Sequence, residues 1–142
     1  LQWHKGYQDQ KAEAKKDQHF KIASISLVVP HIDPLALLEC IDQPNQYHFY
    51  LEHPVEKEAI VGIESILSKT FTGAKRFQQA RGFAQHILKH TIVIGHLDQP
   101  FSGPNFLSAF TFFDQTKKNA TFSPATLFVP RLQIARKHGV YT

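Results

Sequence analysis

Apolar and polar positions alternate over residues 20–29, so the two faces of an extended chain can be told apart. The residues on one face are all apolar: Ala23, Ile25, Leu27 and Val29. The other face carries Ile22, Ser24, Ser26 and Val28. Because strand side chains point alternately to opposite sides and β-branched residues favour strands, the pattern predicts a β-strand with a wholly apolar inner face.

Further on, the spacing of apolar residues changes to that of helices. Asp33 and Pro34 predict the start of a short helix over 35–41, since aspartate accepts a free amide proton and proline loses no bond at the first position. A longer helix is predicted over 72–90, capped by Thr72 or Gly73. Its apolar stripe is formed by Phe77, Ala80, Ala84, Ile87 and Leu88. Residues 1–19 are polar and rich in helix formers, which predicts a surface helix or a frayed lead-in.

The remaining apolar runs read as strands. Residues 47–52 and 59–67 flank a polar segment with Pro54 and predict a β-hairpin with an exposed loop. An aromatic strand is expected over 106–113, and one or two strands over 122–137, with Pro130 at an edge, a bulge or a break. The region 95–105 is expected to be a loop. This order of elements predicts an α+β fold with a mostly antiparallel sheet packed with helices.

Composition places the chain among globular proteins. With 142 residues, 42% of them apolar and 20% charged, it has the size of a single domain. The longest apolar stretch, 22–29, is too short to span a bilayer. Cys40 is the sole cysteine, which excludes an internal disulfide and favours a reducing, cytoplasmic setting. Because it follows Leu37 and Leu38 in a short apolar run, we expect it to be a small buried thiol. There is no methionine, which suggests either a piece of a longer chain or methionines missing from the sequence.

Charge is distributed unevenly along the chain. Residues 1–64 carry ten acids and six lysines, a net −4, whereas residues 65–142 carry ten basic residues and two acids, a net +8. The basic segment 65–97 contains no acid at all. Such a segment is most often a solvated face answered by acids elsewhere in the protein. The alternative is a stand-alone module that binds anions or nucleic acid through this segment.

Candidate chemistry is sparse. His86 and His90 have the four-residue spacing with which two imidazoles can share a metal, but no third ligand is evident. Four glutamates flank the predicted hairpin and are most simply solvated charges: Glu52, Glu56, Glu58 and Glu64. No nucleophile elbow, phosphate loop or dinucleotide fingerprint is present. Core packing is the simplest explanation for six phenylalanines in the last third of the chain, and the alternative is that some of them face a partner domain: Phe106, Phe110, Phe112, Phe113, Phe122 and Phe128.

Several stretches in order resemble the N-terminal region of isochorismate synthase, in the chorismate-utilising enzyme family. They are the helix start 33–35, the hairpin 48–52 with 59–63, Arg76-Phe77, the segments 103–106 and 110–114, and the run Phe128-Val129-Pro130-Arg131. The resemblance covers nearly the whole chain from about Lys21 onward. Where related members often carry glycines in the aromatic strand, this chain has Ser108 and Ala109. Salicylate, anthranilate and aminodeoxychorismate synthases therefore stay open as alternatives.

The resemblance implies a portion of an enzyme that isomerises chorismate to isochorismate for menaquinone or phylloquinone synthesis. It implies half of an αββα sandwich like that of anthranilate synthase, with residues 1–142 as one domain and no catalytic, cofactor-binding or metal-binding residue in them. Chemistry and Mg²⁺ would belong to a C-terminal chorismate-binding region, which is the expected partner, together with chorismate. Neither nucleic acid nor membrane is an expected partner. A third reading is an interaction domain that docks a partner through the aromatic strand.

Overall fold

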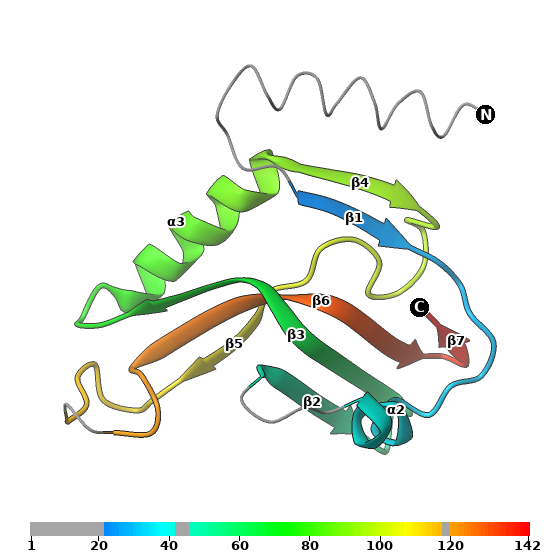
Figure 1. Cartoon of the computed structure of the whole chain (residues 1–142), viewed down its shortest axis with the longest axis horizontal. Coiled ribbons are helices and arrows are strands. Elements are labelled where there is room, and N and C mark those ends of the chain that lie inside the picture. Colours follow the sequence, from blue (N-terminus) through cyan, green and yellow to red (C-terminus); the bar gives the residue numbers. More distant parts are fainter. Residues whose placement is uncertain (1–21, 42–45, 118–119) are drawn as a thin grey trace.

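The protein is described by a computed structural model that covers residues 22–41, 46–117 and 120–142 (Figure 1). The predicted lead-in 1–19 lies outside these residues. The described residues form seven strands and two helices in the order β1 (Ile22–Ser26), α2 (Pro34–Ile41), β2 (His48–His53), β3 (Glu58–Phe71), α3 (Arg76–Lys89), β4 (Thr91–Gly95), β5 (Leu107–Phe110), β6 (Ala125–Lys137) and β7 (Val140–Tyr141). The predicted α+β class with a mostly antiparallel sheet is confirmed.

The main sheet has five strands, and its centre is formed by the two longest. Its order is β2-β3-β6-β5, with β7 also paired to β6, and every pair is antiparallel. The register between β3 and β6 shifts between Ser65 and Leu67, and Pro130 lies opposite Ser65 at this bulge. Pro130 thus occupies one of the positions predicted for it, where the missing N–H costs no regular ladder bond. The predicted hairpin is confirmed as β2 and β3.

A second sheet contains only β1 and β4, which pair in parallel and lie above the long strands (Figure 1). The sequence analysis missed β4, although Thr91-Ile92-Val93-Ile94 is rich in β-branched residues. It also assigned the wrong inner face to β1. Ile22 and Ser26 are buried, whereas Ala23 and Ile25 are exposed. The face with more apolar residues is therefore the more exposed one.

The two helices cover different ends of the main sheet. In α2 the Asp33 carboxylate accepts the N–H of Leu35 at 3.1 Å, which confirms the predicted cap. In α3 the predicted caps are wrong, because Lys75 occupies the cap position without a side-chain bond and the helix begins at Arg76. The stripe predicted for α3 is only partly buried. Ala80 and Ile87 are buried, but Phe77 and Leu88 are exposed.

Apolar side chains gather in three clusters around β3 and β6. One joins Ile60, Leu107, Phe128 and Ala135, and another joins α3 to the far ends of the long strands through Phe71, Ala80, Ala125 and Leu127. The third lies under α2 and contains Val61, Ile63 and Ile134, with Leu37, Leu38 and Ile41 packed against them. Both faces of β3 are buried over Ala59–Ile63, since one face meets α2 and the other meets β5 and the loop before it.

Candidate functional site

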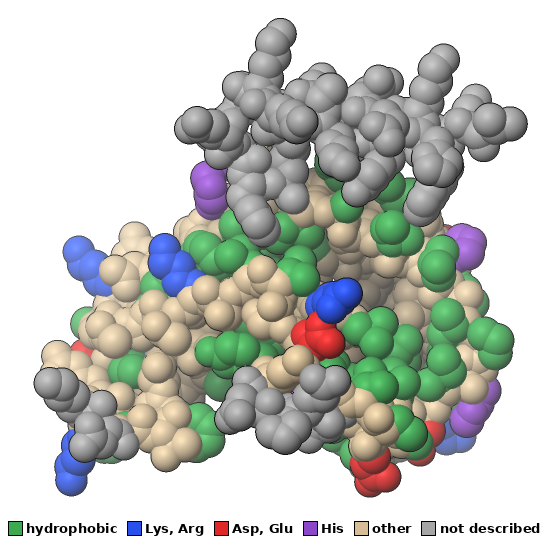
Figure 2. All heavy atoms as spheres, viewed as in Figure 1, with side chains coloured by type: hydrophobic (Ala, Val, Ile, Leu, Met, Phe, Trp, Pro, Cys, Tyr) green, Lys and Arg blue, Asp and Glu red, His purple; other side chains and the backbone are tan. Residues whose placement is uncertain are grey.

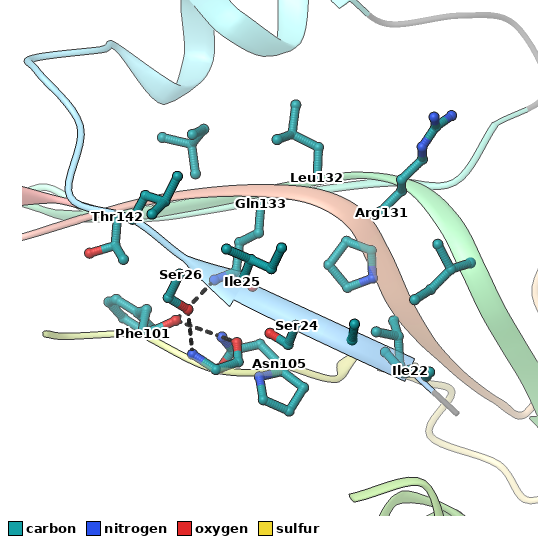
Figure 3. A pocket seen from close by; sticks show the side chains of 18 of the residues that line it. Ile22, Ser24, Ile25, Ser26, Phe101, Asn105, Arg131, Leu132, Gln133 and Thr142 are labelled. Carbon is teal, nitrogen blue, oxygen red and sulfur yellow. Dashed lines mark hydrogen bonds between the residues drawn. The ribbon is translucent and has the colours of Figure 1, made fainter. Parts of the chain in front are cut away.

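A partly enclosed hollow lies between the two sheets. Its volume is about 410 Å³, and it is bounded by β1, by the 101–105 loop, by the second half of β6 and by Thr142 (Figure 3). Ile22, Ile25, Val129 and Leu132 give it a largely apolar wall. The cavity arises because β1 and β6 belong to separate sheets, and the described side chains fill the space between them only in part.

Polar groups at one end of the cavity fasten β1 to the loop. Gly103 N donates to the Ser26 hydroxyl at 2.8 Å, and Asn105 Nδ2 donates to the carbonyls of Phe101 and Gly103 at 2.8 and 3.2 Å. From β6, Gln133 Nε2 also donates to the Phe101 carbonyl, at 3.2 Å (Figure 3). These bonds explain the burial of Ser26, since a hydroxyl inside a protein needs a partner. They are structural bonds that set the shape of the cavity.

The C-terminal end of β1 and the residues that follow it are held by His96 and by Tyr141. His96 N donates to the Ser26 carbonyl at 2.9 Å, and Val28 N donates to His96 Nδ1 at 3.1 Å. Val29 N donates to the Tyr141 carbonyl at 3.0 Å. Thr142, which lines the cavity, exchanges two backbone bonds with Ala135. The C-terminal residues therefore pass beside the cavity and close one of its sides.

The cavity has little of the chemistry that catalysis needs. Among the described residues that line it, only Arg131 is charged; it bonds to Glu64 at 2.9 Å and is mostly exposed. No Asp, Glu or His side chain of the described residues lines it. The arrangement can hold an apolar group or a segment of chain, but it provides neither a nucleophile activated by a base nor a general acid.

The two histidines singled out in the sequence do lie together on α3. The ring centroids of His86 and His90 are 4.6 Å apart, but His90 Nδ1 lies 2.8 Å from the His86 carbonyl oxygen, so this nitrogen is engaged in a backbone bond. Among the described residues, no group of three or more His, Cys, Asp or Glu side chains could hold a metal ion. The pair thus lacks further ligands in the described structure.

Three of the four glutamates near the hairpin are paired with basic residues of β6. Glu52 bonds to Arg136 at 2.8 Å, Glu58 to Lys137 at 2.6 Å, and Glu64 to Arg131. The hydrogen bond from Lys137 lowers the pKa of Glu58. Burial, followed by the hydrogen bond to Glu52, raises the pKa of Tyr50. Glu56 is exposed in the turn. No two of these carboxylates form an acid–base pair, which agrees with their reading as surface charges.

The basic segment 65–97 presents fewer cations than its sequence suggests. Arg76 is only 6% exposed, and its Nη2 donates to the carbonyls of Thr111 and Phe112 at 3.4 and 3.3 Å. It is therefore not available to an external polyanion. Lys75, Arg81 and Lys89 are exposed and belong to the N-terminal cap and solvent side of α3. None of the helices formed by the described residues has the length and apolar character needed to cross a bilayer.

Two expectations about packing are wrong. Cys40 is exposed, because α2 turns Leu37, Leu38 and Ile41 toward the sheet and leaves Cys40 on its outer side. The phenylalanines of the last third are not mainly core. Phe128 is buried, but three rings lie beyond the end of β5, where no described element covers them: Phe112, Phe113 and Phe122. Strand β5 is also shorter than predicted, ending at Phe110.

Comparison with known proteins gives a match to a family model. A protein-family model described as "Chorismate binding enzyme" matches residues 8–142, which is nearly the whole chain. Neither the curated proteins nor the solved structures yielded a match. The match spans all of the described elements, from β1 to β7, and includes every residue that lines the cavity.

Proposed function

Because the chain belongs to the chorismate-binding enzyme family, we propose that it is the N-terminal, non-catalytic portion of an isochorismate synthase. The family match over 8–142 carries this proposal. Within the family, the isochorismate branch is favoured by the resemblance of the lead-in Ser102-Gly103-Pro104 and of the strand after it. The full-length enzyme would isomerise chorismate to isochorismate on the way to menaquinone or phylloquinone.

The described residues contain no suitable catalytic site, which supports a non-catalytic role for this portion of the enzyme. Among the described residues that line the cavity, Arg131 is the only charged one, and three of the four hairpin glutamates are paired with β6 cations. We therefore assign no catalytic, cofactor-binding or metal-binding residue to this chain. The described residues do not fit the Mg²⁺ expected in the full-length enzyme, so no step is derived through the ion here.

In this proposal the chain serves as a scaffold. The main sheet and its helices form a packed body, and the cavity beside β1 offers an apolar wall to a C-terminal chorismate-binding region in the same cytoplasmic polypeptide. Burial of apolar surface is the dominant favourable term in such packing. The scaffold would stabilise that region and leave the reaction to it.

The direct test measures products from chorismate and Mg²⁺ by chromatography. We expect no turnover by the 142-residue chain and isochorismate formation by the longer protein that contains it. Turnover by the chain alone would contradict the scaffold role. Salicylate, anthranilate or aminodeoxychorismate as the product of the longer protein, with ammonia supplied, would move the assignment to another branch of the family.

A further inference from the structure

His96, the residue that follows β4, joins the end of β1 to the loop that borders the cavity. Its N–H donates to the Ser26 carbonyl at 2.9 Å, and its ring Nδ1 accepts the N–H of Val28 at 3.1 Å. Its own carbonyl accepts the Ser102 hydroxyl at 2.6 Å. One residue therefore bonds both to the C-terminal end of β1 and to the loop over 101–105.

The segments that His96 connects are walls of the cavity. Leu27 and Val29, on either side of Val28, line it. Ser26 and Gly103 line it too, and the Ser26 hydroxyl accepts the N–H of Gly103 at 2.8 Å (Figure 3). The bond between the Val28 N–H and the His96 ring therefore holds a piece of chain whose neighbours on both sides form the rim of the cavity.

The bond from Val28 defines the protonation state of the His96 ring. A backbone N–H is a donor, so the nitrogen that it meets must offer a lone pair. In a neutral imidazole one nitrogen carries hydrogen and the other accepts, so the hydrogen of this ring belongs on Nε2. A ring that takes up a second proton has hydrogen on both nitrogens, and Nδ1 then meets Val28 donor to donor. The bond can therefore form only with the neutral ring.

Other titratable and charged groups occur in the described elements that meet near His96. They are His31 after β1, Asp98 in the same loop, Arg131, Arg136 and Lys137 of β6, and His138 and Tyr141 at the β6–β7 hairpin. The three β6 cations are paired with glutamates, and the His31 ring packs on that of Tyr141 with centroids 4.9 Å apart. His31 and His138 carry the same titratable ring as His96, so a test must distinguish the three histidines.

We propose that the bond between His96 and Val28 is a pH-sensitive switch at the cavity: proton uptake by the ring releases the Val28 N–H and loosens the end of β1 from the neighbouring loop. The bond favours the unprotonated ring. Its stabilisation is therefore present at neutral and higher pH and is lost as the pH falls through the range in which imidazole ordinarily takes up a proton. The change stays local, because Val29 N keeps its bond to the Tyr141 carbonyl. The switch does not depend on the proposed function, since it concerns the cavity of this chain alone.

The first test is NMR spectroscopy of the 142-residue chain. The ring nitrogens of His96 at about pH 8 should show the Nε2–H tautomer, and the Val28 amide signal should shift with the same midpoint as the ring. Hydrogen exchange is expressed relative to the unfolded rate at each pH. The protection of Val28 should be about fivefold lower with the protonated ring, as expected for one lost hydrogen bond. Protection of Gly103 should fall with it, whereas that of Val61 in the centre of β3 should not change.

The second test compares histidine variants of the chain. His96→Asn keeps an acceptor oxygen on the side chain but cannot take up a proton, so the pH dependence of Val28 protection should disappear. His138→Asn is the matched control, because His138 is exposed and its φ of 52° is a conformation that asparagine adopts readily. This control and His31→Asn should both keep the pH dependence of Val28.

The outcomes that would overturn the switch are distinct. An Nδ1–H tautomer of the neutral His96 ring would overturn it, because that nitrogen could not accept the Val28 N–H. A pH dependence that persists in His96→Asn, or that disappears in His31→Asn, would assign the effect to another group. Loss of protection at Val28 without loss at Gly103 would overturn the link to the cavity. The tautomer and the shared midpoint are measured on the unsubstituted chain, so they decide the question even where a variant fails to fold.

Discussion

The two sheets of this protein differ in how completely they are covered. The five-stranded sheet is packed on both faces near its centre, and Val61 and Ile63 of β3 are almost fully buried. The two-stranded sheet buries Ile22 and Ser26 but leaves Ile25, Val93 and Ile94 exposed. Parallel sheets are normally covered on both faces, so a pair of parallel strands with an exposed apolar side is unusual.

This difference shows which of the two sheets has its core completed by other described parts of the same chain. Side chains from α2, α3 and the 101–106 segment complete the core of the main sheet from within the chain. The β1–β4 pair has no comparable cover among the described residues, and the cavity lies directly beneath it. The main sheet therefore forms a core of its own, whereas the small sheet lacks a comparable cover among the described residues.

The surface near α2 also carries apolar groups. Figure 2 shows, on one face, hydrophobic side chains at the surface near α2, with few charges among them.

The largest expected effect comes from equal truncations in the two sheets. Ile63→Ala in the main sheet removes a side chain that is 2% exposed and should lower the free energy of unfolding by about 2–5 kcal/mol. Ile25→Ala in β1 removes one that is 49% exposed and should change it by no more than about 0.5 kcal/mol. Denaturant unfolding of both variants measures the contrast. Equal losses would show that the sheets are covered equally.

A glycine at the end of β4 tests how tightly the small sheet is fixed. Gly95 has a φ of 111°, and a Cβ there would overlap the Ser26 carbonyl. Gly95→Ala should therefore cost about 1–3 kcal/mol and loosen β1 in hydrogen exchange. Gly82→Ala is the matched control, because Gly82 lies in open space on α3 and alanine there should add about 1 kcal/mol of stability. Unchanged exchange in β1 after Gly95→Ala would contradict the strained contact.

The cover of the main sheet can be weakened at the start of α2. Asp33→Ala removes the carboxylate that accepts the Leu35 N–H and should cost about 1 kcal/mol. Asp98→Ala, an exposed aspartate in the loop after β4, serves as the control and should change little. Thermal unfolding followed by circular dichroism gives both values. A loss no larger than that of the control would mean that packing alone holds α2.

The smallest expected effect concerns a surface ion pair at the edge of the main sheet. The pKa of Glu58 is lowered by the hydrogen bond from Lys137, so the pair stabilises the fold above the ordinary value of 4.5 and loses this contribution as the pH falls below it. Glu58→Gln should therefore lower stability slightly at neutral and mildly alkaline pH, where both partners are charged, and should have no effect well below pH 4.5, where the wild-type pair is already lost. A raised pKa of Glu58 in an NMR titration would reverse the sign and contradict the pairing.

The sequence predicts the parts of this fold that depend on local chemistry. The Asp33-Pro34 helix start, the β2–β3 hairpin and the bulge position of Pro130 all follow from residue preferences and are confirmed. The inner face of β1 could not be derived, because both faces contain apolar residues and only the placement of β6 and the 101–105 loop selects Ile22 and Ser26. The cavity joins segments far apart in sequence, such as β1 and Thr142, which no spacing rule brings together.

The burial of Arg76 could not be predicted from the charge pattern of the sequence. In the sequence it belongs to an acid-free basic segment, and nothing there distinguishes it from Lys75 or Arg81. Its burial depends on the turn after β5, 35 residues away. The exposure of Phe112 likewise accompanies the end of β5 at Phe110, which leaves Phe112 in the turn that follows.

Strand β6 also sets the order in which the protein can be assembled during synthesis. It pairs with β3 over Ala59–Phe71 on one edge and with β5 and β7 on the other. A nascent chain that has not yet reached Ala125 can form the hairpin and α3, but it has no partner for the second edge of β3. Pairing strands so distant in sequence is slow, because the intervening chain must be ordered first. Ribosome-bound chains are therefore most exposed to misfolding just before β6 emerges.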